Sequence, residues 1–235
     1  MKVEIWSDIM CPFCYIGKRK FEAALEQFPE KDSIQVEWKS FQLNAGLKQE
    51  PGRDIYDYLA SIKGESREWA AQALAQMTGM AKESGLDFHF EKAVVANSFD
   101  AHRLIQFAKQ HQLGDAAEEQ LFAAYFTEGK DVSNHETLAD IGAAIGLNRD
   151  AVVAMLRSDD FSGTVNTDGL EAQQLGARGV PFFVMDRKLG VAGAQPVEVF
   201  TQALTQAFGE WKKAQPLTTL ENIEGPVCSP DGTCN

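Results

Sequence analysis

The sequence has little positive charge and no long hydrophobic run. Its 22 lysines and arginines are outnumbered by 34 aspartates and glutamates, which gives a net charge of −12 at pH 7. A charge of this sign argues against general binding to nucleic acid or to anionic membranes. No stretch approaches the roughly 20 apolar residues that a membrane-spanning helix needs. We therefore expect neither a nucleic-acid partner nor a membrane partner.

The N-terminus also lacks the features of a secretory signal. The chain begins with a short apolar segment that contains Glu4 and is followed by Asp8. It does not show the basic region and the subsequent hydrophobic stretch of a signal peptide. We therefore expect a cytoplasmic protein. Cysteine is scarce, with four residues in two close pairs. In a reducing compartment such pairs are more often catalytic, redox-sensing or metal-binding than structural.

Motifs for resident cofactors are missing as well. No Gly-x-Gly-x-x-Gly follows a strand pattern, no phosphate-binding loop is visible, and no pair of carboxylates stands out as an acid–base dyad. We expect no bound metal and no cofactor. Electrons would then come from a partner thiol, such as glutathione acting as a co-substrate or another redox protein.

What the sequence does have is a Cys-x-x-Cys pair, Cys11-Pro12-Phe13-Cys14, between a strand pattern and a helix pattern. If Cys11 lies at the first turn, free backbone amides and the helix dipole favour its thiolate, the dipole by roughly 0.3–1 kcal/mol. Pro12 suits the first helical position, and Cys14 lies one turn further on. We predict that Cys11 is the attacking thiolate and Cys14 the resolving thiol. The alternative is half of a zinc site or two incidental cysteines.

Hydrophobic periodicity predicts an α/β chain whose strands come from its two ends. Strands are expected at 2–6, 34–41, 181–185 and 189–192, and helices at 12–28, 54–62, 66–82, 97–110, 115–127, 133–145, 148–156, 162–175 and 198–213. The end segments then form β-α-β and β-β-α units of one sheet, with a right-handed crossover and parallel pairing in the first. We predict one domain from residues 1–44 and 178–215, an inserted all-helical domain at 45–177, and a tail at 216–235.

Two helix starts carry capping signals. Ser133 and Glu136 match the capping-box pattern, with Ser133 as the N-cap residue. Asn148 is expected to cap the helix that follows it.

Taken together, these features resemble the DsbA-type thioredoxin fold, and within it the FrnE-like subfamily of cytoplasmic oxidoreductases. The resemblance rests on Ser7 to Gly17, Asn97 to Arg103 and Gly179 to Val184, and it covers nearly the whole chain. It implies a thioredoxin-like sheet with a large helical insertion. It also implies the activity of a thiol–disulfide oxidoreductase of the protein-disulfide oxidoreductase or isomerase kind.

The resemblance further implies that the Val180–Pro181 bond is cis and lies beside Cys11. A proline has no N–H group, so the backbone of Val180 would stay free to pair with an extended substrate. We therefore predict that Pro12, Phe13, Val180 and Pro181 bind substrate. The sequence alone also permits a trans proline at the start of a strand.

Two other functions stay open. The family also contains glutathione-using isomerases and transferases, such as the 2-hydroxychromene-2-carboxylate isomerase type, which carry Ser where this chain has Cys11. A non-catalytic redox sensor is the third reading. The expected partners are thiol or disulfide proteins or small thiols, and the protein is expected to be a monomer or a homodimer.

A second cysteine pair, Cys228 and Cys234, lies near the C-terminus. Pro230-Asp231-Gly232 between them is a turn signal that can bring the two sulfurs together. We predict that this pair exchanges with Cys11 and Cys14 as a redox relay or sensor. A local staple or a metal-binding tail is the alternative.

His102 lies on the apolar face of a predicted helix. A histidine in such a place is more often a bonded core residue than a catalytic one, although its side chain titrates near neutrality. The resemblance places it near the active-site cleft without giving it a role.

Overall fold

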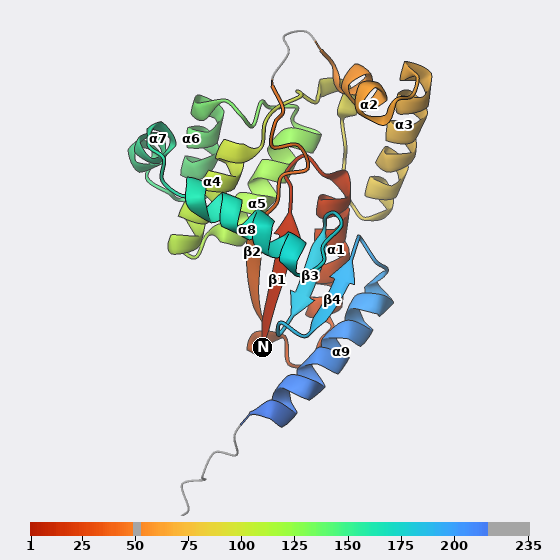
Figure 1. Cartoon of the computed structure of the whole chain (residues 1–235), viewed down its shortest axis with the longest axis vertical. Coiled ribbons are helices and arrows are strands. Elements are labelled where there is room, and N and C mark those ends of the chain that lie inside the picture. Colours follow the sequence, from red (N-terminus) through yellow and green to blue (C-terminus); the bar gives the residue numbers. More distant parts are fainter. Residues whose placement is uncertain (49–52, 216–235) are drawn as a thin grey trace, which may run out of the picture.

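The computed structural model describes residues 1–48 and 53–215, which form a four-stranded sheet surrounded by helices (Figure 1). The strands are β1 (Lys2–Ser7), β2 (Gln35–Ser40), β3 (Phe182–Met185) and β4 (Leu189–Ala192). The helices are α1 (Pro12–Glu26), α2 (Ile55–Lys63), α3 (Arg67–Glu83), α4 (Phe99–Gln110), α5 (Gly114–Phe122), α6 (His135–Ala144), α7 (Arg149–Arg157), α8 (Ser162–Gln174) and α9 (Val197–Ala214). Within these residues no helix combines the length and the hydrophobicity needed to cross a bilayer.

The sheet joins the two ends of the chain in the order β2-β1-β3-β4. β1 pairs with β2 in parallel, as predicted, and with β3 in antiparallel orientation. β3 and β4 form a hairpin through Asp186 and Arg187, which both have positive φ angles. The C-terminal end of β1, from which the chain turns into the Cys-x-x-Cys segment, therefore lies in the middle of the sheet.

Helices cover both faces of the sheet. On one face Phe21 of α1, Phe183 of β3 and Phe200 of α9 pack together, with ring centroids 4.6–5.7 Å apart. On the other face Trp6 packs against Phe182, and its indole N–H donates a 2.7 Å hydrogen bond to a main-chain carbonyl of α8. The alternation along β1 explains this arrangement, because successive side chains point to opposite faces.

The helices between β2 and β3 form two groups. Figure 1 shows the α2–α3 hairpin on one side of the upper end of the sheet and the group from α4 to α7 on the other. α8 runs from the second group across the sheet and contacts α4, β1 and β2. This arrangement leaves the N-terminus of α1 between the two groups.

One of the two predicted helix caps is wrong. The N-cap of α6 is Asn134, which accepts hydrogen bonds from the amides of Glu136 and Thr137, whereas Ser133 donates its hydroxyl to Asp131. An Asx residue one position later therefore takes over the cap. Asn148 caps α7 as predicted, by accepting from the Ala151 amide at 2.9 Å.

The helix predicted at 115–127 changes its winding part of the way along. α5 ends at Phe122, and a π-helical turn, Ala123–Thr127, follows it. Such turns are frequent at functional sites, and this one carries Tyr125 and Phe126. The proposed domain boundaries stay a prediction, and the tail at 216–235 lies outside the described residues.

Candidate active site

Cys11 is the N-cap residue of α1, at the C-terminal side of β1. Its backbone is extended, with φ −94° and ψ 110°, and Pro12 occupies the first position of the helix. The Cys11 amide donates to the carbonyl of Asp8 at 2.9 Å, and the Cys14 amide donates to the carbonyl of Cys11 at 2.9 Å. The predicted geometry is thus present, with Cys11 at the amino end of the helix and Cys14 one turn on.

The sulfur of Cys11 meets the loop before β3. The Cys11 thiol donates to the carbonyl oxygen of Val180 with an Sγ–O distance of 3.6 Å, and the Val180–Pro181 bond is cis, as the resemblance implied. Both cysteines are free thiols, and the Cys11 side chain is only 4% exposed. The fold therefore brings Cys11, Val180 and Pro181 together from opposite ends of the chain.

Cys14 lies deeper than Cys11. It is 1% exposed, and burial raises the pKa of its thiol well above the usual value. Hydrogen bonding and charge from Cys11 raise it further, whereas the Asp8 amide and the Ser7 hydroxyl act in the opposite direction. Because a buried thiolate is costly, Cys14 stays protonated at neutral pH.

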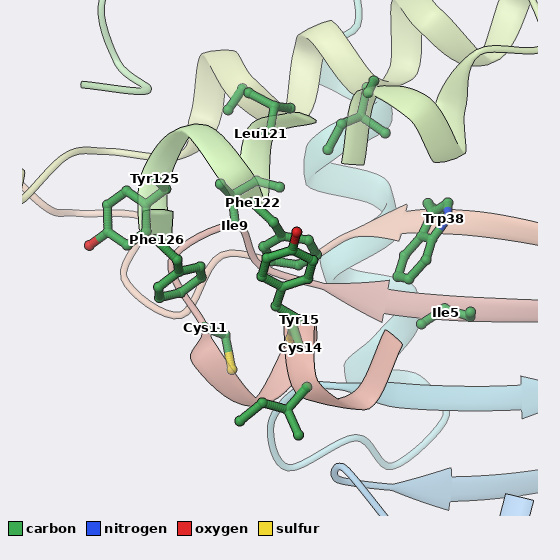
Figure 2. Close-up of a cluster of buried hydrophobic side chains, with 14 of the residues drawn as sticks. Ile5, Ile9, Cys11, Cys14, Tyr15, Trp38, Leu121, Phe122, Tyr125 and Phe126 are labelled. Carbon is green, nitrogen blue, oxygen red and sulfur yellow. The ribbon is translucent and has the colours of Figure 1, made fainter. Parts of the chain in front are cut away.

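A cavity of about 490 Å³ opens beside Cys11. Its wall is mostly apolar and comes from the Cys-x-x-Cys segment, the α2–α3 hairpin and the π-helical turn: Asp8, Met10, Cys11, Pro12, Phe13, Leu43, Asn44, Ile55, Tyr58, Leu59, Ile62, Lys63, Trp69, Ala73, Leu74, Met77, Phe90, Tyr125 and Phe126. Figure 2 shows Tyr125 and Phe126 on the same side of the close-up as Cys11. Phe13 is 39% exposed at this wall, so it is available to a ligand rather than part of the core.

An aromatic stack holds α1 against α5. The ring of Tyr15 lies 4.7 Å from that of Phe122 in a stacked arrangement (Figure 2). The Tyr15 hydroxyl donates a 2.6 Å hydrogen bond to Glu119. Arg19 pairs with the same carboxylate. These contacts orient the helix that carries both cysteines.

Buried polar groups lie behind the cysteines. Burial alone would raise the pKa of Asp8, but hydrogen bonding and charge from His102 lower it, together with a 2.7 Å hydrogen bond from the Leu43 amide. The Nε2 atom of His102 lies 3.4 Å from the carboxylate of Asp8, and His102 is 1% exposed. His102 is therefore a buried residue that reaches the cavity wall through Asp8, and its functional role stays a prediction.

The structure adds Ser7 and Glu118 to this buried group, each 1% exposed. Sequence reasoning missed both. Ser7 stands next to Asp8 in the segment that carries the family resemblance, which is a usable signal. Glu118 looks like any other acidic residue on the surface of a helix, so no local pattern marks it.

The cysteines Cys228 and Cys234 lie outside the described residues. Within residues 1–48 and 53–215, no group of three or more histidine, cysteine, aspartate or glutamate side chains is arranged to hold a metal ion. The geometry described above is suited to exchange of a disulfide at Cys11.

Comparison with known proteins agrees with this geometry. The model of the DSBA-like thioredoxin domain matches residues 2–205. A crystal structure described as a probable DsbA oxidoreductase from Streptomyces coelicolor is 39% identical, with a TM-score of 0.85, and the match covers all of this chain and 98% of the other. The protein YwbO of Bacillus subtilis (strain 168), described as uncharacterized, is 24% identical over 205 residues, which are 86% of this chain and 95% of its own length.

A more distant neighbour is the cytosolic disulfide reductase DsbM from Pseudomonas aeruginosa. It is 16% identical, with a TM-score of 0.62, over 91% of this chain and 98% of its own. It has also been solved with GSH. At this identity the likeness concerns the fold alone. The predicted thioredoxin-like fold of the DsbA type is confirmed, and the narrower placement in the FrnE-like subfamily stays a prediction.

Proposed function

Because the chain belongs to the DSBA-like thioredoxin domain family, we propose that it is a thiol–disulfide oxidoreductase in which Cys11 exchanges with substrate and Cys14 resolves the product. The observation that carries this proposal is the asymmetry of the pair. Cys11 lines the cavity, whereas Cys14 is buried and its pKa is raised. Only one of the two sulfurs is thus placed to meet a substrate.

The exchange runs in two steps. The Cys11 thiolate attacks one sulfur of a substrate disulfide, which forms a mixed disulfide and expels the other substrate sulfur as a thiolate. Cys14 then loses its proton and attacks Cys11, which forms the Cys11–Cys14 disulfide and releases the second thiolate. Two molecules of a partner thiol restore the dithiol and leave as their disulfide, and the same steps in reverse oxidise a substrate.

The cavity wall supports substrates with apolar groups beside the reacting sulfur. Only two of its lining residues, Asp8 and Lys63, carry a charge, and its aromatic side chains include Phe13 and Trp69. Apolar walls with few polar groups are typical of binding sites for large apolar groups. The backbone of Val180 and the side chains of Pro12, Phe13 and Pro181 would complete the substrate site. We propose disulfide proteins as substrates and a thiol, for which glutathione is the candidate, as the partner.

A cytoplasmic location belongs to the same proposal. It is supported by the cytosolic description of the DsbM neighbour and by the rule that paired thiols in a reducing compartment are often redox-active. The oligomeric state, monomer or homodimer, stays a prediction.

A relay through Cys228 and Cys234 is compatible with the length of the chain. α9 runs beside α1, with Phe208 packed on Phe28, so α9 ends at the end of α1 remote from Cys11. The 15 residues of α1 span about 22 Å. The 13 residue-to-residue steps from Gln215 to Cys228 are long enough to reach up to ~45 Å.

Insulin reduction by dithiothreitol tests the main proposal. The wild type should accelerate it, Cys11→Ser should abolish the acceleration, and Cys14→Ser should accumulate a covalent Cys11–substrate adduct that a reductant releases. A wild type without acceleration, or a Cys11→Ser protein with full activity, would reject the proposal. A Cys228→Ser/Cys234→Ser protein with unchanged turnover would reject the relay alone.

The same assay separates the alternatives. The apolar cavity of about 490 Å³ could also hold a small aromatic molecule, as a glutathione-dependent isomerase or transferase requires. Such an enzyme would need glutathione and would survive Cys14→Ser. A redox sensor would exchange slowly and show no turnover.

A further inference from the structure

Tyr125 carries a buried hydroxyl group that makes no hydrogen bond to any described part of the chain. The residue lies in the π-helical turn that follows α5 and is 1% exposed. Buried hydroxyl groups are normally hydrogen-bonded, because an unpaired one gives up its bonds to water without a replacement. The hydroxyl group of Tyr125 therefore indicates a partner from outside the chain.

The ring of Tyr125 belongs to the wall of the cavity that also contains Cys11. It packs edge-on against Phe126, with ring centroids 4.8 Å apart, and this contact fixes its direction. Figure 2 shows the hydroxyl oxygen of Tyr125 pointing away from the stacked rings of Tyr15 and Phe122. Aromatic packing thus holds the ring in place and leaves the hydroxyl group unpaired.

A second phenol, Tyr58 of α2, lines the same cavity. Its oxygen accepts a 3.2 Å hydrogen bond from the side chain of Asn44. A hydroxyl group that accepts one bond still has its own proton to donate. Two phenolic donors from different elements, α2 and the π-helical turn, therefore line a cavity whose wall is mostly apolar.

The charges near Tyr125 favour a neutral acceptor. Burial raises the pKa of Tyr125, and the charges of Asp8 and Tyr58 raise it further, so its hydroxyl group stays protonated at neutral pH. The carboxylate of Asp8 accepts hydrogen bonds from the amides of Leu43 and Met10, at 2.7 and 3.3 Å. An anionic ligand group would be repelled by this carboxylate, whereas a neutral oxygen would not.

We propose that the hydroxyl groups of Tyr125 and Tyr58 bind a neutral acceptor oxygen at the end of an apolar substrate group, and so determine which disulfides react well at Cys11. This inference rests on the proposed function. The substrate class is a disulfide peptide in which the residue beside the reacting cysteine has a large apolar side chain that ends in a ketone or phenol oxygen. Such a side chain matches a cavity of about 490 Å³ whose wall is apolar except for a few polar groups.

The two tyrosines take different places in this site. Tyr58 is 8% exposed and Tyr125 is 1% exposed, so Tyr58 is the outer contact and Tyr125 the inner one. A side-chain shift in the wall accompanies the bond to Tyr125, and rotamer changes of this kind are common on binding.

Two matched peptides test the proposal. Both are cystine-linked dimers of a dipeptide amide, with 4-acetylphenylalanine beside the cysteine in one and 4-isopropylphenylalanine in the other. Only the first has the acceptor oxygen, and in both a saturated carbon separates the ring from the backbone, so the sulfurs react alike. Chromatography follows the catalysed reduction of each peptide by dithiothreitol. With the wild type, the KM for the acetyl peptide should be about three- to tenfold lower, the range expected for one net hydrogen bond.

Phenylalanine variants remove the donors one at a time. In Tyr125→Phe the KM values for the two peptides should become equal, while kcat stays within about twofold of the wild type. Tyr58→Phe should reduce the KM ratio as well. Tyr56→Phe is the matched control, because Tyr56 lies on α2 but is not part of the cavity wall, and its KM ratio should be that of the wild type.

The stability of Tyr125→Phe is an independent readout. Because the hydroxyl group is unpaired within the described chain, its removal should leave the free energy of unfolding in urea unchanged or raise it. A loss of stability, or a variant that does not fold, would show that the hydroxyl group has a partner inside the protein and would overturn the inference.

The kinetic outcomes separate the inference from the proposed function. Equal KM values for the two peptides in the wild type, or the wild-type ratio in Tyr125→Phe or Tyr58→Phe, would overturn the inference and leave the proposed function standing. A wild type that accelerates the reduction of neither peptide would overturn both.

Discussion

A β-carbon added to Gly17 would lie 3.0 Å from the Cγ atom of Pro181. Gly17 belongs to α1, so the helix that carries the cysteines approaches the Val180–Pro181 segment at a position without a side chain. The same added carbon would lie 3.5 Å from Ala194. The close packing of this glycine places the Val180 carbonyl beside the Cys11 sulfur.

Gly17→Ala should therefore destabilise the protein. Glycine to alanine within a helix usually stabilises by roughly 0.5–1 kcal/mol, but here the methyl group meets a rigid ring, and we expect a loss of about 1–2 kcal/mol. Turnover should fall because Pro181 and Val180 move away from Cys11. Gly79→Ala in α3 is the matched control, since nothing lies within 4 Å of its added carbon. In urea denaturation, the free energy of unfolding should fall in Gly17→Ala and rise in Gly79→Ala, relative to the wild type. Equal changes in the two variants would contradict the packing argument.

The two active-site thiols should differ in reactivity. In the Cys228→Ser/Cys234→Ser background, iodoacetamide near neutral pH should modify Cys11 at least about tenfold faster than Cys14, since each unit of raised pKa lowers the thiolate fraction about tenfold. Burial raises the pKa of Cys14, and Cys14 is not among the residues that line the cavity. Peptide mass mapping of partly alkylated protein shows which of the two cysteines is modified first. Comparable rates for the two cysteines would remove the basis for their assigned roles.

Trp69→Ala should weaken the binding of apolar substrates. Trp69 lines the cavity and is 38% exposed, so its removal should raise the KM for a cystine peptide with an aromatic neighbour by about three- to tenfold, which corresponds to ~0.6–1.4 kcal/mol. The rate of reaction with dithiobis-nitrobenzoate, a small aryl disulfide, should change less than the reaction with the peptide. Leu170→Ala is the control, because Leu170 is 59% exposed on α8 and is not part of the cavity wall. An equal KM for both variants would place the substrate elsewhere.

Glu118→Gln should become the more stable protein as the pH rises. The folded pKa of Glu118, about 7, exceeds its ordinary value of 4.5. The unfolded chain therefore releases this proton at lower pH than the folded protein does. Wild-type stability should fall relative to Glu118→Gln between pH 4.5 and about 7, by about 2–3 kcal/mol in total.

Urea denaturation of both proteins at pH 4.5 and pH 8 measures this difference. The stabilities of the two proteins should differ least at pH 4.5, where the carboxyl group is protonated in the folded state and about half protonated in the unfolded chain. A wild type that gains stability relative to Glu118→Gln with rising pH would show that the buried carboxylate is paired after all. If the free energies of unfolding of the two proteins differ by the same amount at pH 4.5 and pH 8, the glutamine changes packing rather than charge.

Much of the secondary structure was predictable because it depends on neighbours within a few residues. The alternation at 34–41 led to β2 (Gln35–Ser40), and Asn148 capped α7 as expected. The cap of α6 was missed because Ser133 and Asn134 both have the right chemistry, and the competing bond from Ser133 to Asp131 is visible only in the structure. The π-helical turn after Phe122 was missed because its residues fit a regular helix equally well.

Local sequence was enough to place Cys11 at the start of a helix and Cys14 one turn on, because the Cys-x-x-Cys segment with Pro12 lies between a strand pattern and a helix pattern. The surroundings of the two cysteines depend instead on how distant segments of the chain pack together. The carbonyl of Val180 and the cavity wall from α2 and α3 reach Cys11 from distant parts of the chain. Local sequence patterns reflect the periodicity of a single helix or strand. Contacts between distant segments arise only when separate elements pack together and exclude water. That exclusion of water raises the pKa of Cys14 and of Glu118.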